Sequence, residues 1–203
     1  MSQIESFGQN PVGRFPVQAT TASGRADSVS SSASATLAVR PAVGEEKADP
    51  ALSPPELVTA LAAAKAREAA AAADADDAVI AADTIVVFGR RVFGKPHSRA
   101  EAAQMLRTLS GNTHEVYTGV CVIRNGAELC RSDRSAVTFR PLSEEEIARY
   151  IDTGEPMDKA GAYGAQGRGA LFVERIDGDF FNVMGLPLCV LGEMLKEQGV
   201  GLL

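Results

Sequence analysis

Three Ser-x-x-Glu motifs divide the chain and limit the folds that it can adopt. They begin at Ser53, Ser98 and Ser143. In each motif the serine side chain can accept a hydrogen bond from the third helical N–H, and the glutamate can accept one from the serine N–H, so each motif predicts the start of a helix. The predicted helices cover about 54–73, 99–109 and 144–151, and a further helix is expected near 188–198.

The segments between these helices are predicted to be strands. The run Ala78–Phe88 is apolar and rich in valine and isoleucine, which is typical of a buried strand. Residues 114–124 and 128–140 are joined at Asn125-Gly126, a dipeptide typical of a tight β-hairpin. A last strand is expected near 171–176. Strands that alternate with helices, together with a hairpin, predict an α/β fold with a mixed, twisted sheet flanked by helices.

The composition is that of a globular protein with an unusual beginning. The chain has 203 residues, of which 45% are hydrophobic and 23% charged, enough for one sizeable core. Residues 1–36 are rich in serine, threonine, alanine and glycine and poor in large apolar side chains, so we expect this segment to be poorly ordered. We therefore divide the chain into an atypical N-terminal segment, 1–36, and a folded domain, 37–203.

Charge and hydropathy exclude several classes of function. The net charge is −6 and the sequence has no cluster of lysine and arginine, which argues against a protein that binds a DNA or RNA duplex. The absence of a long apolar run and of a secretory signal predicts a soluble, cytoplasmic protein without a membrane partner. The three cysteines lack metal-ligand spacing, so reduced thiols are expected rather than a disulfide or a zinc site.

Candidate functional residues lie around the apolar run. Asp83 is an acidic residue inside a buried strand, where it needs a cation, a donor or a substrate. The pattern alone supports equally an aspartate that caps a helix or ends its strand. Lys65 lies on an alanine-rich helix, where a lysine is more often solvated than a ligand. Gly94-Lys95-Pro96 precedes a helix N-terminus, where backbone N–H groups and a lysine can meet phosphate oxygens, although an ordinary turn explains the same residues.

A glycine-rich stretch, 158–169, offers a second candidate site. Its glycines allow close approach of the backbone to a ligand, while Lys159 and Gln166 could contact a phosphate and a base edge. A flexible loop is the alternative, yet long loops within a compact domain are commonly functional. His97 and His114 are too isolated to indicate a metal site, and no serine or cysteine stands in a nucleophile motif.

The order of these motifs resembles that of the Maf family of nucleoside triphosphate pyrophosphatases. The resemblance begins at about Val39 and covers most of the chain. It is carried by Val43-Gly44-Glu45-Glu46, Leu61-Ala62-Ala63-Ala64-Lys65-Ala66, Ala82-Asp83-Thr84, Gly94-Lys95-Pro96, Leu109-Ser110-Gly111, His114-Glu115-Val116-Tyr117-Thr118-Gly119, Gly154-Glu155-Pro156, Asp158-Lys159-Ala160-Gly161 and Gly185-Leu186-Pro187. Within the family, Lys159, Tyr163 and Gln166 resemble the branch that acts on dTTP and UTP.

The resemblance implies a fold, a reaction and a set of roles. The fold would be the two-lobed Maf/ITPase-like architecture, with the nucleotide cleft between the lobes. The reaction would be hydrolysis of dTTP or UTP to the monophosphate and pyrophosphate by a homodimer that requires Mg²⁺ or Mn²⁺. Asp83 would be the general base, Glu45 would bind the metal, and the substrate would be bound by Lys65, Thr84, Lys95, Lys159 and Gln166.

The sequence departs from the family at its beginning. The family opens with a short strand and a Ser-x-Ser-Pro-Arg-Arg loop, whose arginines contact the nucleotide. Here residues 28–36 read Ser-Val-Ser-Ser-Ser-Ala-Ser-Ala-Thr instead. Permitted codons for these residues, read one base later, encode Pro-Ser-Pro-Arg-Arg, so a frame change is one explanation. The competing function is a catalytically impaired, Maf-like nucleotide-binding or interaction protein that lacks the arginine loop.

Overall fold

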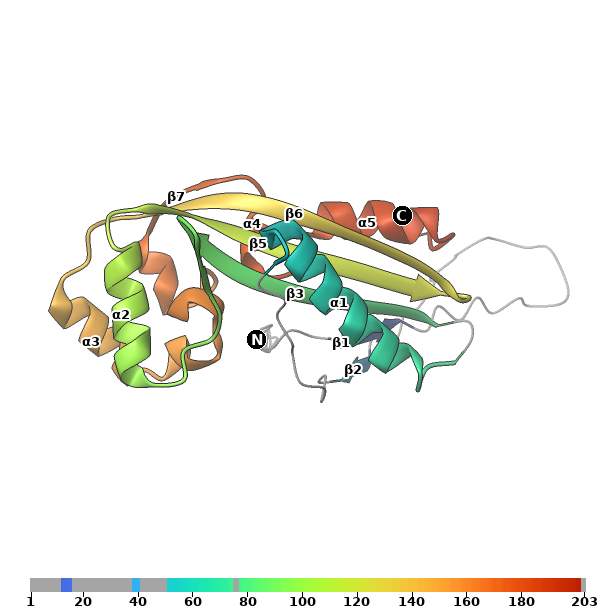
Figure 1. Ribbon diagram of the computed structural model, residues 1–203, viewed down its shortest axis with the longest axis horizontal. Helices are drawn as coiled ribbons and strands as arrows, with labels where there is room; N and C mark the ends of the chain where they lie inside the picture. Colours follow the sequence, from blue (N-terminus) through green and yellow to red (C-terminus); the bar gives the residue numbers. More distant parts are fainter. Residues whose placement is uncertain (1–11, 16–37, 41–50, 75–76, 202–203) are drawn as a thin grey trace, which may run out of the picture.

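The computed structural model describes residues 12–15, 38–40, 51–74 and 77–201, and Figure 1 shows an elongated molecule built on one long sheet. The strands are β1 (Val12–Phe15), β2 (Ala38–Arg40), β3 (Ala78–Phe88), β4 (Arg91–Phe93), β5 (Thr113–Arg124), β6 (Ala127–Phe139) and β7 (Val173–Asp177). The helices are α1 (Pro54–Ala70), α2 (Arg99–Leu109), α3 (Glu144–Asp152), α4 (Phe180–Met184) and α5 (Leu188–Glu197). Three 3₁₀ helices cover Glu155–Asp158, Ala160–Ala162 and Arg168–Phe172. Among the described residues, no helix is long and apolar enough to cross a membrane.

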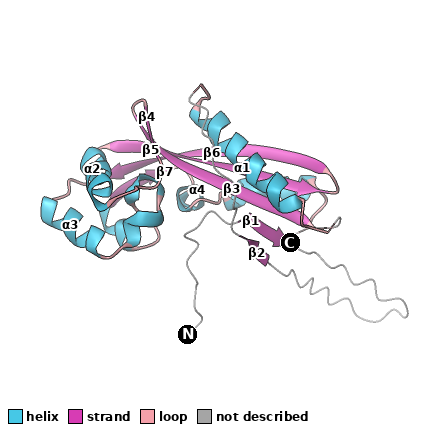
Figure 2. Cartoon of the chain, turned by 60° about the horizontal axis from the view of Figure 1, so that its bottom comes forward, coloured by secondary structure: helices cyan, strands magenta, loops and turns pink. Residues whose placement is uncertain are grey.

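The expected α/β architecture is confirmed, but the strand directions differ from the expected mixed sheet. The seven strands are ordered β2-β1-β3-β5-β6-β7, with β4 paired to β3. Every ladder between the described strands is antiparallel. The connection from β3 to β5 runs through β4 and α2 at one end of the sheet, so α2 does not cross a sheet face as the helix of a parallel crossover would (Figure 2).

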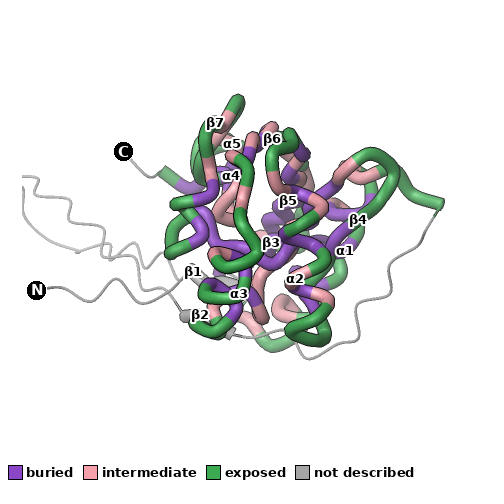
Figure 3. The backbone as a smooth tube through the Cα atoms, turned by 90° about the vertical axis from the view of Figure 1, so that its left-hand side faces the viewer, coloured by how far each residue is buried: buried purple, intermediate pink, exposed green. Residues whose placement is uncertain are grey.

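Helices cover both faces of the sheet. On one face, α1 packs on alternate residues of β3, including Val79, Ala81 and Ile85. On the other face, α5 packs on Ala78, Ile80 and Ala82 in a group that we call the α5 cluster. At the far end of the sheet, α2, α3 and the 3₁₀ helices enclose a larger group around Phe139, the end cluster. Strands β3 and β5 are mostly buried along their length, as the purple segments of Figure 3 show.

The capping motifs start helices as predicted. The boxes at Ser53 and Ser143 are complete, with reciprocal contacts to Glu56 and Glu146. At Ser98 the serine side chain accepts from the N–H of Glu101, but the Glu101 carboxylate accepts from the N–H of His97. Helix α2 has the predicted bounds, whereas α1 ends at Ala70 rather than near residue 73.

The hairpin between β5 and β6 is also confirmed. Asn125 has φ 50° and Gly126 has φ 76°, the left-handed conformations that a two-residue turn of this kind requires. This register places Cys121 opposite Cys130, and the two form a disulfide. The expectation of reduced thiols is therefore wrong for this pair, because the two-residue turn at Asn125-Gly126 sets a register in which the two cysteines face each other.

Four short elements were not predicted, namely β1, β2, β4 and α4. Strand β1 lies within the N-terminal segment that was expected to be poorly ordered, and it pairs with Ala78–Ala81 of β3. The remainder of residues 1–36 lies outside the described residues. Elements of three to five residues have too few positions for a periodic pattern of apolar side chains, which explains why the sequence did not predict these four elements.

Candidate active site

A buried ion pair lies at the centre of the candidate site. The Nζ atom of Lys65, on α1, is 2.5 Å from Oδ1 of Asp83, on β3, and the two side chains are 6% and 3% exposed. Removing both charges from water costs several kcal/mol per ion, which a pair repays only when its geometry is favourable. The pair answers the question that the sequence left open, because Asp83 meets a cation rather than capping a helix or ending its strand.

The close packing of α1 on the sheet sets the position of this pair. Gly119 of β5 is the cross-strand partner of Asp83. A Cβ atom at Gly119 would lie 2.2 Å from the carbonyl oxygen of Val58, so the backbone of α1 rests directly on β5. The alanines of α1, among them Ala62 and Ala66, allow the same close approach along the rest of the helix. Small residues thus bring Lys65 within reach of the strand.

The pair lies beside an interval of β3 that has a described partner strand on one side only. On the side away from β5, β3 pairs with β1 over Ala78–Ala81 and with β4 over Val86–Phe88. No strand among the described residues pairs with 82–85 on this side. Asp83 and Thr84 both lie in this interval, and because side chains alternate along a strand, they project to opposite faces. Asp83 therefore lies on the face that α1 covers, where it meets Lys65, and Thr84 lies on the opposite face.

Thr84 belongs to a chain of polar groups beneath α4. Its Oγ1 is 2.9 Å from Oγ1 of Thr118 on β5, and the Thr118 hydroxyl donates to the carbonyl oxygen of Asn182 at 2.9 Å. The Asn182 side chain is buried and donates from Nδ2 to the carbonyl of Val116 and to Oγ of Ser135. Sequence reasoning did not assign a role to Thr118 or Asn182.

The glycine-rich stretch is organised by Glu155 rather than by a ligand. The Glu155 carboxylate accepts hydrogen bonds from the N–H groups of Arg168 and Gly169 at 3.0 and 3.1 Å and from the Tyr150 hydroxyl at 2.9 Å. A Cβ atom at Gly167 would lie 2.4 Å from this carboxylate, so the loop closes around it. The N–H groups of Arg168 and Gly169 are thus hydrogen-bonded within the protein.

A buried histidine fixes the start of the same stretch. His114 Nε2 lies 2.8 Å from the Tyr163 hydroxyl, and the His114 ring packs edge-on against Phe139. Burial lowers the pKa of His114 to about 4, so the ring is neutral at neutral pH. Burial also raises the pKa of Tyr163, which keeps its hydroxyl protonated. The isolated His114 is therefore a support for the loop, consistent with its exclusion as a metal ligand.

The structure brings together some of the predicted site residues. Lys65 and Asp83 are in contact. The loop of Lys95 lies beside the segment of Lys159, because the N–H of Gly161 donates to the carbonyl of Gly94 at 3.1 Å. Lys95 is exposed and Lys159 is half-buried, with its Nζ 2.8 Å from the carboxylate of Asp158. Gln166 is exposed on the loop that Glu155 organises, and Glu45 lies outside the described residues.

Among the described residues, Asp83 offers donor atoms that suit a hard divalent cation. Carboxylate oxygens are ligands that Mg²⁺ and Mn²⁺ prefer, and Asp83 supplies such oxygens on β3, one of them in contact with Lys65. The other group of potential ligands among the described residues is Cys121, Glu128 and Cys130. It does not fit such a cation, because its sulfur atoms form a disulfide and Glu128 is held by the guanidinium of Arg67.

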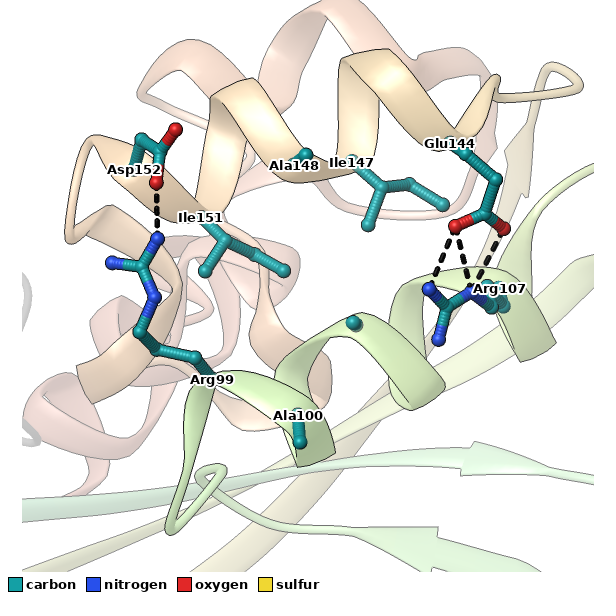
Figure 4. Close-up of a pocket in the computed structure, with 9 residues that line it drawn as sticks. Arg99, Ala100, Arg107, Glu144, Ile147, Ala148, Ile151 and Asp152 are labelled. Carbon is teal, nitrogen blue, oxygen red and sulfur yellow. Dashed lines mark hydrogen bonds and ion pairs between the residues drawn. The ribbon is translucent and has the colours of Figure 1, made fainter.

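A groove between α2 and α3 lies away from these residues. Its floor is apolar and contains Ile147 and Ile151, and ion pairs cross it from Arg99 to Asp152 and from Arg107 to Glu144 (Figure 4). None of the predicted site residues lines it. The ion pairs connect the two helices and are exposed, so the groove is part of the packing of α3 on α2.

Several known proteins align with most of this chain. A family model described as Maf-like protein matches residues 19–198. The dTTP/UTP pyrophosphatase of Moorella thermoacetica is 52% identical over 151 residues, which make up 73% of this chain and 77% of the relative. The dTTP/UTP pyrophosphatase of Bacillus velezensis is 52% identical over 156 residues, or 77% and 82% of the two chains. That of Symbiobacterium thermophilum is 50% identical over 155 residues, or 76% and 79%. The chain belongs to the Maf family, as the order of its motifs indicates.

Proposed function

We propose that this protein hydrolyses the α–β phosphoanhydride of dTTP and UTP, giving the nucleoside monophosphate and pyrophosphate, with Asp83 as the general base. The proposal is supported by relatives that are named dTTP/UTP pyrophosphatases and are about half identical to this chain. In enzyme class the chain is a nucleoside triphosphate pyrophosphatase, a hydrolase of acid anhydrides.

The observation that carries the catalytic role is the buried pair of Lys65 and Asp83. An ammonium group 2.5 Å from a carboxylate oxygen favours the ionised form of the carboxylate. Only an ionised carboxylate can accept the proton of an attacking water. Burying two charges between α1 and β3 is unfavourable, and a catalytic role of the Asp83 carboxylate would explain why the pair is present.

The other predicted residues supply charge and recognition. Lys95 and Lys159 lie on adjacent segments and would neutralise the triphosphate and the leaving pyrophosphate. Thr84 and Gln166 would contact the edge of the pyrimidine base. Mg²⁺ or Mn²⁺, held by Glu45, would supply further neutralisation of phosphate charge. A homodimer and a cytoplasmic location belong to the same proposal.

The experiment is to measure pyrophosphate release from dTTP, UTP, CTP and GTP with Mg²⁺. It compares the full chain with Asp83→Asn and with a matched control, Asp177→Asn, which changes an exposed aspartate at the end of β7. We expect release from dTTP and UTP by the unaltered chain and by the control, and a loss of at least 100-fold in Asp83→Asn, since a positioned general base contributes roughly that much or more.

Two outcomes would contradict the proposal. Equal activity of Asp83→Asn and the unaltered chain would exclude Asp83 as the base. No release from any nucleotide, by protein whose circular dichroism shows it to be folded, would favour the catalytically impaired alternative.

A further inference from the structure

Three polar groups in a row connect β3 to α4. The hydroxyls of Thr84 and Thr118 are 2.9 Å apart, and the Thr118 hydroxyl is also 2.9 Å from the carbonyl oxygen of Asn182. Thr118 and Asn182 are fully buried. The carbonyl position is fixed as well, because the N–H of Gly185 donates to it at 2.9 Å and the Asn182 side chain donates to Val116 and Ser135.

The protons of this row can be placed by counting donors. A carbonyl oxygen accepts hydrogen bonds and cannot donate one. The single proton of Thr118 must therefore point to Asn182, which leaves lone pairs of Thr118 facing Thr84. Thr84 must then donate its own proton to Thr118, since two oxygens at 2.9 Å without a proton between them would repel each other. The Thr84 hydroxyl thus retains only acceptor capacity on its remaining side.

Thr84 itself is half-buried, whereas Thr118 and Asn182 are fully buried. Thr84 lies between Ala82, in the α5 cluster, and Val86, in the end cluster, and it follows Asp83 in the interval where β3 has a described partner strand on one side only. The neighbour of its hydroxyl is Gly185, where a Cβ atom would come within 3.2 Å of Thr84 Oγ1. Glycine therefore leaves the approach to this oxygen clear.

We infer that Thr118 is a specificity-determining positioning residue, which forces Thr84 to act as a hydrogen-bond acceptor toward the base. This inference rests on the proposed function. Uracil and thymine carry a proton on N3 and can donate to such an oxygen, whereas N3 of cytosine is an acceptor and would face another acceptor. A threonine whose hydroxyl rotates freely could donate to cytosine as well, so the discrimination comes from Thr118 and not from Thr84 alone.

The test removes the Thr118 hydroxyl and measures base discrimination. Thr118→Val keeps the shape of the side chain and frees the Thr84 proton, while Thr118→Ser retains the hydroxyl. Thr113→Val is a matched control, because Thr113 of β5 and Thr138 of β6 form another cross-strand pair, with hydroxyls 2.8 Å apart at an exposed end of the neighbouring ladder. The readouts are the ratio of kcat/KM for UTP to that for CTP, and the ratio of the dissociation constants of UMP and CMP by calorimetry.

We expect the UTP preference to fall roughly tenfold in Thr118→Val, the scale of one hydrogen bond, and to remain in Thr118→Ser and Thr113→Val. An unchanged ratio in folded Thr118→Val overturns the inference while leaving the hydrolase proposal intact. If the unaltered chain hydrolyses nothing, the proposed function fails, and the calorimetric ratio alone decides the inference. Equal binding of UMP and CMP by the unaltered chain, or binding of neither, overturns it. Should Thr118→Val not fold, Thr118→Ala takes its place, because a smaller side chain requires no repacking.

Discussion

Replacing His114 with glutamine is expected to remove a large part of the dependence of folding stability on pH. The ring of His114 is enclosed by the end cluster and contacts Phe139 and Tyr163 edge-on. Among the described residues, its Nδ1 atom is buried without a hydrogen-bond partner. Protonation would place a charge in this apolar site, so the folded protein resists it and the pKa of His114 falls to about 4 from 6.5.

The sign and size of the effect follow from the two pKa values. Between pH 6.5 and pH 4 the unfolded chain binds this proton more readily than the folded protein, so the free energy of unfolding decreases as the pH falls. The loss attributable to His114 is about 2 kcal/mol at pH 5 and about 3 kcal/mol at pH 4, relative to neutral pH. The stability is fully present above pH 6.5.

The assay is urea unfolding at pH 7.5 and pH 5, followed by far-ultraviolet circular dichroism. The quantity of interest is the difference in unfolding free energy between the two pH values, which we expect to be about 2 kcal/mol smaller in His114→Gln than in the unaltered chain. His97→Gln is the control, because His97 is exposed and is the other histidine of the chain. The same difference in all three proteins would refute the reasoning, as would a loss in His97→Gln equal to that in His114→Gln.

Four further changes test the site and its supports. Lys65→Met leaves the Asp83 charge buried without its cation, and it should lower the unfolding free energy by about 3 kcal/mol or more in urea titrations; an unchanged midpoint would contradict this. Glu155→Ala removes the acceptor of two loop N–H groups and should raise KM for dTTP and lower stability by about 1–3 kcal/mol, whereas a loss confined to kcat would contradict its role in placing the loop. Gly119→Ala should destabilise the protein by roughly 3 kcal/mol or more, because its Cβ would collide with α1; an unchanged thermal midpoint would show that α1 lies farther from β5. Replacing residues 28–36 with the shifted reading that contains Pro-Ser-Pro-Arg-Arg should raise kcat for dTTP, and an equal kcat would show that the arginines are dispensable.

Local signals in the sequence predicted the regular elements well. The capping motif at Ser143 and the turn at Asn125-Gly126 act through hydrogen bonds and backbone angles within a few residues, so the printed sequence contains all the information they need. The apolar run that became β3 has the observed bounds for the same reason. The direction of β3 relative to β1 and β5 depends on contacts between distant segments, which the order of residues does not specify.

The candidate site was predictable in its residue types and not in its partners. A buried aspartate demands a cation, and the sequence held Lys65 as one candidate among several lysines. Lys65 is the partner of Asp83 because α1 packs closely on β5 at Gly119. No local sequence pattern predicts this contact. The proton of Thr84 is a similar case, because its direction is set by Thr118 and by a carbonyl of α4. A hydroxyl that could both donate and accept in isolation is limited to one role by its neighbours.

The glycine-rich stretch shows that close approach of a backbone to an anion need not involve a ligand. Glycines at 164, 167 and 169 do permit close approach to an anion, as the sequence suggested. The anion that approaches Gly167 and Gly169 is the carboxylate of Glu155, which arrives from the preceding turn. Once these donors are occupied, the loop is held in one conformation, and its exposed residue, Gln166, is presented by a rigid support. Any contact of Gln166 with a nucleotide would therefore depend on Glu155, a side chain that need not touch the triphosphate.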